Sequence, residues 1–121
     1  MSRVFVTKSF NKFATKHRIS DAQLLESIEN AGKGLIDANL KGCLVKLRIG
    51  RKGQGKSSGF RTIVAFSTRK KSFFLYGFGK NVTANISRAD IDGLEEYGSI
   101  LLRLTNMELE MMTLAREILE I

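Results

Sequence analysis

The chain has 121 residues, 43% of them hydrophobic, and a net charge of +8. This length predicts one domain over residues 1–121, and the hydrophobic fraction excludes a disordered chain. No apolar run approaches the roughly 20 residues of a membrane span, and the first residues lack the features of a signal peptide. The single cysteine excludes an internal disulfide. We therefore expect a cytoplasmic protein with no membrane partner.

The first third of the chain predicts a strand followed by two helices. Arg3–Thr7 has the composition of a short strand. Apolar residues at helical spacing then predict a helix over Ser9–Lys16. Ser20 begins an S-x-x-Q capping box, so a second helix should run from Asp21 to about Gly32.

The middle of the chain predicts three further strands that form a meander. Leu44–Ile49 alternates between apolar and basic residues, which is typical of a half-buried strand. A loop over Gly50–Gly59 separates it from a second strand, Phe60–Ser67. Ser72–Lys80 is apolar on both faces, which favours a central position in the sheet.

The last third predicts helices. One begins at Ser87, and a T-x-x-E capping box at Thr105 begins another. Ile118–Ile121 fits either a short strand or a helix end. The fold class is therefore α+β, a small antiparallel or mixed sheet of about four strands with two N-terminal helices and C-terminal helices.

Charge is distributed unevenly along the chain. Residues 1–88 carry 18 Lys and Arg against 4 Asp and Glu, whereas residues 89–121 carry 2 against 8. Twelve cations and no acid lie between Asp37 and Asp90. Such a segment is either a solvated basic face or a polyanion site, and the sharp separation favours the polyanion site.

Residues Gly50–Ser57 match the pattern G-x-x-x-x-G-K-[ST] of nucleotide-binding phosphate loops. That loop must open a helix, whose N-terminus holds the phosphates. Here a β-rich run follows instead, so we reject a nucleotide triphosphatase. Glycines beside cations nevertheless allow a close approach to phosphate.

One histidine and one cysteine cannot supply a zinc site, so we expect no metal and no cofactor. His17 lies at helical spacing from Phe10 and Phe13, which predicts a packed or capping histidine. Cys43 should pack beside an apolar strand. No carboxylate pair lies in the basic segment, which excludes glycosidase chemistry there.

A basic sheet face therefore remains as the candidate site. We expect Arg61 to lie on an open part of this face, within reach of the same phosphate as Lys56. Tyr76 and Phe78 either stack on a base or pack in the core, which is the commoner place for strand aromatics. The cations of this face and its loop are Lys46, Arg48, Arg51, Lys52, Lys56, Arg61 and Lys80.

The string KLRIGRKGQGKSSGFR, followed by FLYGFGKN and NIS, resembles the RelE-like toxins of bacterial toxin–antitoxin pairs, in particular the HigB branch. The resemblance covers essentially the whole chain, and its most specific parts are Lys52–Arg61 and Gly79–Asn81. It implies the RelE-like microbial ribonuclease-type fold. It also implies a metal-independent endoribonuclease that cuts mRNA, usually in the ribosomal A site, by driving the 2′-hydroxyl onto the adjacent phosphate. The implied partners are mRNA, the ribosome and a cognate antitoxin, which we expect to be of the helix-turn-helix type.

By position, the resemblance implies roles for individual residues. Asn81 replaces an arginine of the RelE branch, and a tyrosine of that branch falls near Ile86 or Ser87, so the general acid and base are unassigned. Together with the basic loop, this makes Lys56, Arg61, Lys80 and Asn81 the candidate catalytic residues. The candidate RNA-binding residues are Lys46, Arg48, Arg51, Lys52 and Tyr76.

Two other functions fit the sequence. A ParE-like toxin shares the fold but inhibits a topoisomerase by protein contact, and a non-catalytic module would bind RNA without cutting it. The loop cations favour RNA cleavage over topoisomerase inhibition, because phosphate contacts dominate nucleic-acid affinity.

Overall fold

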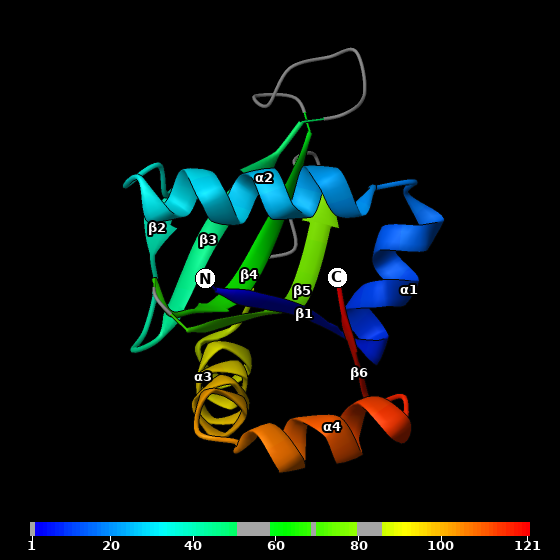
Figure 1. Cartoon of the computed structure of the whole chain (residues 1–121). Helices are drawn as coiled ribbons and strands as arrows, with labels where there is room; N and C mark the ends of the chain where they lie inside the picture. Colours follow the sequence, from blue (N-terminus) through cyan, green and yellow to red (C-terminus); the bar gives the residue numbers. More distant parts are fainter. Residues whose placement is uncertain (1, 51–58, 69, 80–85) are drawn as a thin grey trace.

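The computed structural model describes residues 2–50, 59–68, 70–79 and 86–121. Figure 1 shows the helix Asp21–Gly32 crossing in front of the sheet, the helix Lys8–Lys16 at its right, and the helices Arg88–Leu102 and Asn106–Leu114 below it. Within the described residues, no helix combines the length and apolar character that crossing a membrane requires. The elements are β1 (Arg3–Thr7), α1 (Lys8–Lys16), α2 (Asp21–Gly32), β2 (Ala38–Asn39), β3 (Leu44–Ile49), β4 (Phe60–Phe66), β5 (Lys71–Gly79), α3 (Arg88–Leu102), α4 (Asn106–Leu114) and β6 (Ile118–Glu120).

The strands form one mixed sheet in the order β2-β3-β4-β5-β1-β6. β1 pairs in parallel with β5, and the other neighbours are antiparallel. The α+β class is confirmed, and so are the β3–β4–β5 meander and the central place of β5. The expected number of about four strands is wrong, because the described residues contain six. The additional strands are β2, with two residues, and β6, with three, which are too short for a clear alternation pattern.

Helix starts follow the predicted caps. Ser20 accepts a hydrogen bond from the backbone N–H of Gln23, whose side chain binds the Ser20 N–H in return. Thr105 and Glu108 form the same reciprocal box at the start of α4. Each box pairs N–H groups that the first helical turn leaves without intrahelical partners. These starts are therefore set by local sequence.

Different helices pack against the two faces of the sheet. The face of β3 that carries Val45, Leu47 and Ile49 packs with apolar residues of α1 and α2. The opposite face packs with α3 and α4, and it includes Leu44 of β3 and Ile63 of β4. Since α3 and α4 cover only part of this second face, β3, β4 and β5 also present partly exposed side chains there.

Aromatic packing holds α1 against the sheet, and it includes His17 as predicted. The His17 ring lies 4.6 Å from the Phe13 ring and 5.0 Å from the Phe60 ring, between centroids, and its backbone caps α1. Gly77 of β5 lies under Phe13, whose ring would be 2.3 Å from an added Cβ. α1 can thus approach β5 closely only because residue 77 has no side chain.

The first and last strands, β1 and β6, are neighbours in the sheet (Figure 1). The N–H of Ile121 donates to the carbonyl of Val4 at 2.9 Å. The Arg3 guanidinium binds both carboxylate oxygens of Glu120, at 2.8 and 2.9 Å. Hydrogen bonds from Arg3 lower the pKa of the Glu120 carboxyl.

Candidate nucleic-acid interface and active site

Strand pairing places the predicted site residues in two rows across the sheet. Lys46 of β3 lies opposite Ile63 of β4, which lies opposite Tyr76 of β5. In the next row, Arg48 lies opposite Arg61, which lies opposite Phe78. Directly opposed residues of antiparallel strands point to the same face. The sheet therefore brings together residues that are up to 32 positions apart in the sequence.

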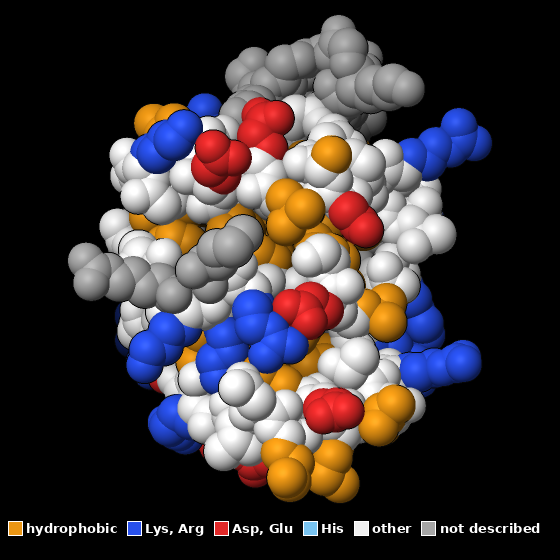
Figure 2. Space-filling view, viewed as in Figure 1, with side chains coloured by type: hydrophobic (Ala, Val, Ile, Leu, Met, Phe, Trp, Pro, Cys, Tyr) orange, Lys and Arg blue, Asp and Glu red, His pale blue; other side chains and the backbone are white. Residues whose placement is uncertain are grey.

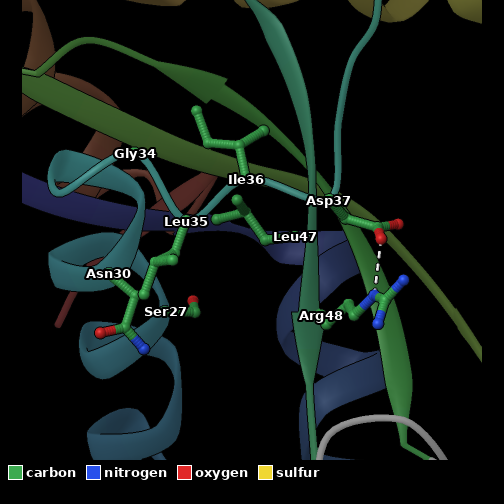
Figure 3. Close-up of a pocket in the computed structure, with 8 residues that line it drawn as sticks. All are labelled: Ser27, Asn30, Gly34, Leu35, Ile36, Asp37, Leu47 and Arg48. Atoms are coloured by element: carbon green, nitrogen blue, oxygen red, sulfur yellow. Dashed lines mark hydrogen bonds and ion pairs between the residues drawn. The ribbon is translucent and has the colours of Figure 1, made fainter.

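A single carboxylate joins the three cations of these rows. The Asp37 Oδ1 atom lies 2.6 Å from Arg48 Nε, the ion pair drawn in Figure 3. Its Oδ2 atom lies 3.6 Å from both Lys46 Nζ and Arg61 Nε. We call these four residues the Asp37 cluster. With three cations and one anion, the cluster carries a formal charge of +2.

Burial differs sharply within the cluster. The side chains of Asp37 and Arg61 are only 9% and 11% exposed, whereas those of Lys46 and Arg48 are 33% and 50% exposed. The expectation that Arg61 lies on an open sheet face is therefore wrong, because its side chain is largely buried and forms an ion pair with Asp37. Low exposure strengthens electrostatic interactions, since less water screens them. The cluster is thus a fixed set of donors already arranged around one anion.

Tyr76 and Phe78 flank the cluster on β5. The register of β4 and β5 shifts between Ile63 and Val64, so that Leu75 is an additional residue on β5. Tyr76 is 41% exposed, and its ring centroid lies 6.0 Å from that of Phe78. Tyr76 therefore presents an open aromatic ring on the same face as the cations, where a nucleobase can stack.

The other predicted site residues lie outside the described residues. Within the described part, β3 ends at Ile49, β4 begins at Phe60, and β5 ends at Gly79 opposite Phe60. The positions of these residues in the site stay predictions. They are Arg51, Lys52, Lys56, Lys80 and Asn81.

Asp37 is the residue that sequence reasoning missed. It precedes the two-residue strand β2, and its backbone N–H donates to the carbonyl of Lys46 at 2.9 Å. That contact holds its carboxylate beside the cations of β3 and β4. The absence of any acid between Asp37 and Asp90 was the available signal, because Asp37 is the acid nearest in sequence to the basic strands.

A second polar group surrounds Cys43, beside α3. Its Sγ atom lies 3.4 Å from Glu95 Oε2, which accepts a 2.6 Å hydrogen bond from the Ser99 hydroxyl. Burial raises the pKa of the Cys43 thiol, while the Ser99 hydrogen bond lowers the pKa of the Glu95 carboxyl. A thiol with a raised pKa is a poor nucleophile at neutral pH. Cys43 packs beside the α3 and α4 core, as predicted.

Comparison with known proteins agrees with the observed fold. Residues 2–121 match the family model described as "RelE toxin of RelE / RelB toxin-antitoxin system". A search of curated proteins gives no significant match. The match does not distinguish the HigB branch, which stays a prediction. Because the match spans nearly the whole sequence, the chain belongs to the RelE toxin family.

Proposed function

We propose that this toxin cleaves mRNA on the ribosome without a metal ion. The observation that carries the proposal is the Asp37 cluster, where three cations gather on a sheet face around one anion. Membership of the RelE family, whose toxins are in general endoribonucleases, supports it. Cations held in fixed positions can stabilise an anionic transition state without rearranging.

The proposed reaction breaks one phosphodiester bond by internal attack. The 2′-oxygen of a ribose loses its proton and attacks the adjacent phosphorus, and the bond from phosphorus to the 5′-oxygen breaks. The products are a 2′,3′-cyclic phosphate and a 5′-hydroxyl, whose oxygen gains a proton. Negative charge builds on the non-bridging oxygens, where a guanidinium can donate two parallel hydrogen bonds.

We assign the side chains to two roles in this reaction. The residues proposed to act on the reacting phosphate are Lys56, Arg61, Lys80 and Asn81. The residues proposed to bind the rest of the RNA are Lys46, Arg48, Arg51, Lys52 and Tyr76. Asp37 holds the Arg48 and Arg61 guanidinium groups in place, and an incoming phosphate must share these cations with its carboxylate.

A RelE toxin has an antitoxin partner. We propose that it is an acidic protein of the helix-turn-helix type, acting in the cytoplasm, that covers basic surface of the toxin. Residues 1–88 carry 18 cations against 4 acids. Lys and Arg side chains project over α1 at the right of Figure 2. An exposed apolar stripe on α4, formed by Met107, Met111 and Leu114, offers a partner further contact area.

Cleavage on purified translating ribosomes tests the proposal. We expect the wild-type protein to cut the mRNA and Arg61→Ala to cut it at least about 10²-fold more slowly, the usual cost of one lost preorganised donor. A protein that blocks a topoisomerase and leaves mRNA intact would favour the ParE-like function. Binding of RNA without cleavage would favour the non-catalytic module. Native mass spectrometry with the product of the neighbouring gene tests the antitoxin separately.

A further inference from the structure

A groove lies beside the Asp37 cluster, between the C-terminal half of α2 and β3. The segment from Gly34 to Asp37 closes one end of it (Figure 3). Its volume is about 440 Å³, within the range of small-molecule sites. The groove is therefore large enough for one ring system of a ligand.

The groove has apolar walls. Leu47 of β3 is buried and forms the floor, and Ile36 is partly buried beside it. Leu35 forms the rim and is 66% exposed, although leucine gains free energy when it is covered. A flat apolar surface that enters the groove would cover Leu35.

Polar groups line the sides of the groove. The Asn30 side chain, which offers both a donor and an acceptor, has no hydrogen bond within the described residues. The Asp37 N–H donates to the Lys46 carbonyl, which points to the edge of β3 where β2 lies. Every second residue of a strand directs its backbone groups to the same edge, so the N–H and C=O of Arg48 also point there. β2 reaches only as far as Lys46 and does not pair with Arg48. A nucleobase edge carries donors and acceptors that such groups can bind.

The groove and the cluster share two residues. Asp37 and Arg48 line the groove, and they form the 2.6 Å ion pair of the cluster. We propose that the groove binds the base of one RNA nucleotide whose phosphate lies against the cluster. This inference rests on the proposed function, because it names the part of the substrate that this end of the site recognises.

An extended peptide fits the groove less well than a nucleotide. Peptides that add a strand to a sheet use backbone hydrogen bonds along several residues. In the described part of β3, only Leu47–Ile49 lies beyond the end of β2. The cations of the cluster also match a phosphate better than an uncharged backbone.

Titration with three kinds of small probe tests the proposal by NMR. The probes are inorganic phosphate, ribose 5-phosphate and each of the four nucleoside monophosphates. For the wild-type protein we expect at least one nucleotide to bind about tenfold more tightly than ribose 5-phosphate, a difference of about 1.4 kcal/mol. Leu35→Ala should remove most of this difference and leave the affinity for inorganic phosphate unchanged. Asn30→Ala should reduce the discrimination among the four bases.

Leu114→Ala on α4 is the matched control, because Leu114 is also exposed and lies away from the groove. Equal binding of nucleotides and ribose 5-phosphate by the wild-type protein would overturn the proposal. Equal effects of Leu35→Ala and Leu114→Ala on nucleotide affinity would also overturn it. A Leu35→Ala variant that changes antitoxin affinity and leaves nucleotide affinity unchanged would overturn it too, and would make the groove a protein-binding surface. Base-dependent binding by a protein that cuts no mRNA would refute the proposed function and leave the groove assignment standing.

Discussion

Arg61→Ala should lower both stability and activity, for two separable reasons. The Arg61 side chain is 11% exposed and forms an ion pair with Asp37, with 3.6 Å between Arg61 Nε and Asp37 Oδ2. Its removal leaves the largely buried Asp37 carboxylate with two cations instead of three. Removing one partner of a fully buried pair typically costs about 3–5 kcal/mol of unfolding free energy.

The expected cost here is smaller, because Asp37 keeps Arg48 at 2.6 Å and Lys46 at 3.6 Å. We expect a loss of about 1.5 kcal/mol, about half the lower figure for a fully buried pair. For a domain of this size, that corresponds to a fall in Tm of about 6 °C. The protein should remain folded at 25 °C, so that its activity can be measured.

A double-mutant cycle separates the two effects. Asp37→Asn should relieve part of the Arg61→Ala loss, because no unpaired carboxylate then remains, with a coupling of at least about 0.5 kcal/mol in denaturant unfolding. The double variant should stay inactive, since the donor to the phosphate is still missing. Additive stabilities would refute the inferred ion pair. A folded Arg61→Ala protein that cuts mRNA at the wild-type rate would refute the catalytic role.

Two further predictions concern single carboxylates. Asp37→Asn should tighten RNA binding, because the freed cations can neutralise additional phosphates. Each additional phosphate should steepen the slope of log affinity against log salt concentration by about 0.7. Asp92→Asn, which breaks an exposed pair with Lys41, should change neither the affinity nor the slope. Hydrogen bonds from Arg3 lower the pKa of the Glu120 carboxyl in the folded protein. The ionised carboxylate therefore stabilises the fold above the ordinary pKa of about 4.3, and this stabilisation is lost as the pH falls through the lower folded value. Glu120→Gln should therefore reduce stability at pH 7 and flatten its acid dependence in denaturant titrations.

Local patterns predicted most of the elements. The capping boxes at Ser20 and Thr105 fixed two helix starts, because both partners lie within one turn. The alternation of β3 correctly assigned Val45, Leu47 and Ile49 to one buried face. β2 was missed because two residues hold no periodicity, and its pairing depends on the neighbouring strand.

The site was less predictable than the fold. The cations Lys46, Arg48 and Arg61 were identified correctly as neighbours on one sheet face. The position of Asp37 depends on a backbone hydrogen bond to β3, which composition does not encode, and it gives the largely buried Arg61 an anionic partner. Tyr76 is exposed because α3 and α4 cover only part of the second face, a consequence of tertiary packing.

Cleavage of an mRNA that carries a single 2′-deoxy nucleotide tests the central claim most directly. The wild-type toxin first cuts an all-ribose message on purified ribosomes, and the cut site is mapped. The nucleotide on the 5′ side of that site is then replaced by its 2′-deoxy form. We predict that cleavage at the site is lost and that the all-ribose product ends in a 2′,3′-cyclic phosphate. Undiminished cleavage of the 2′-deoxy message would contradict the account, because the attacking oxygen would then not come from the RNA.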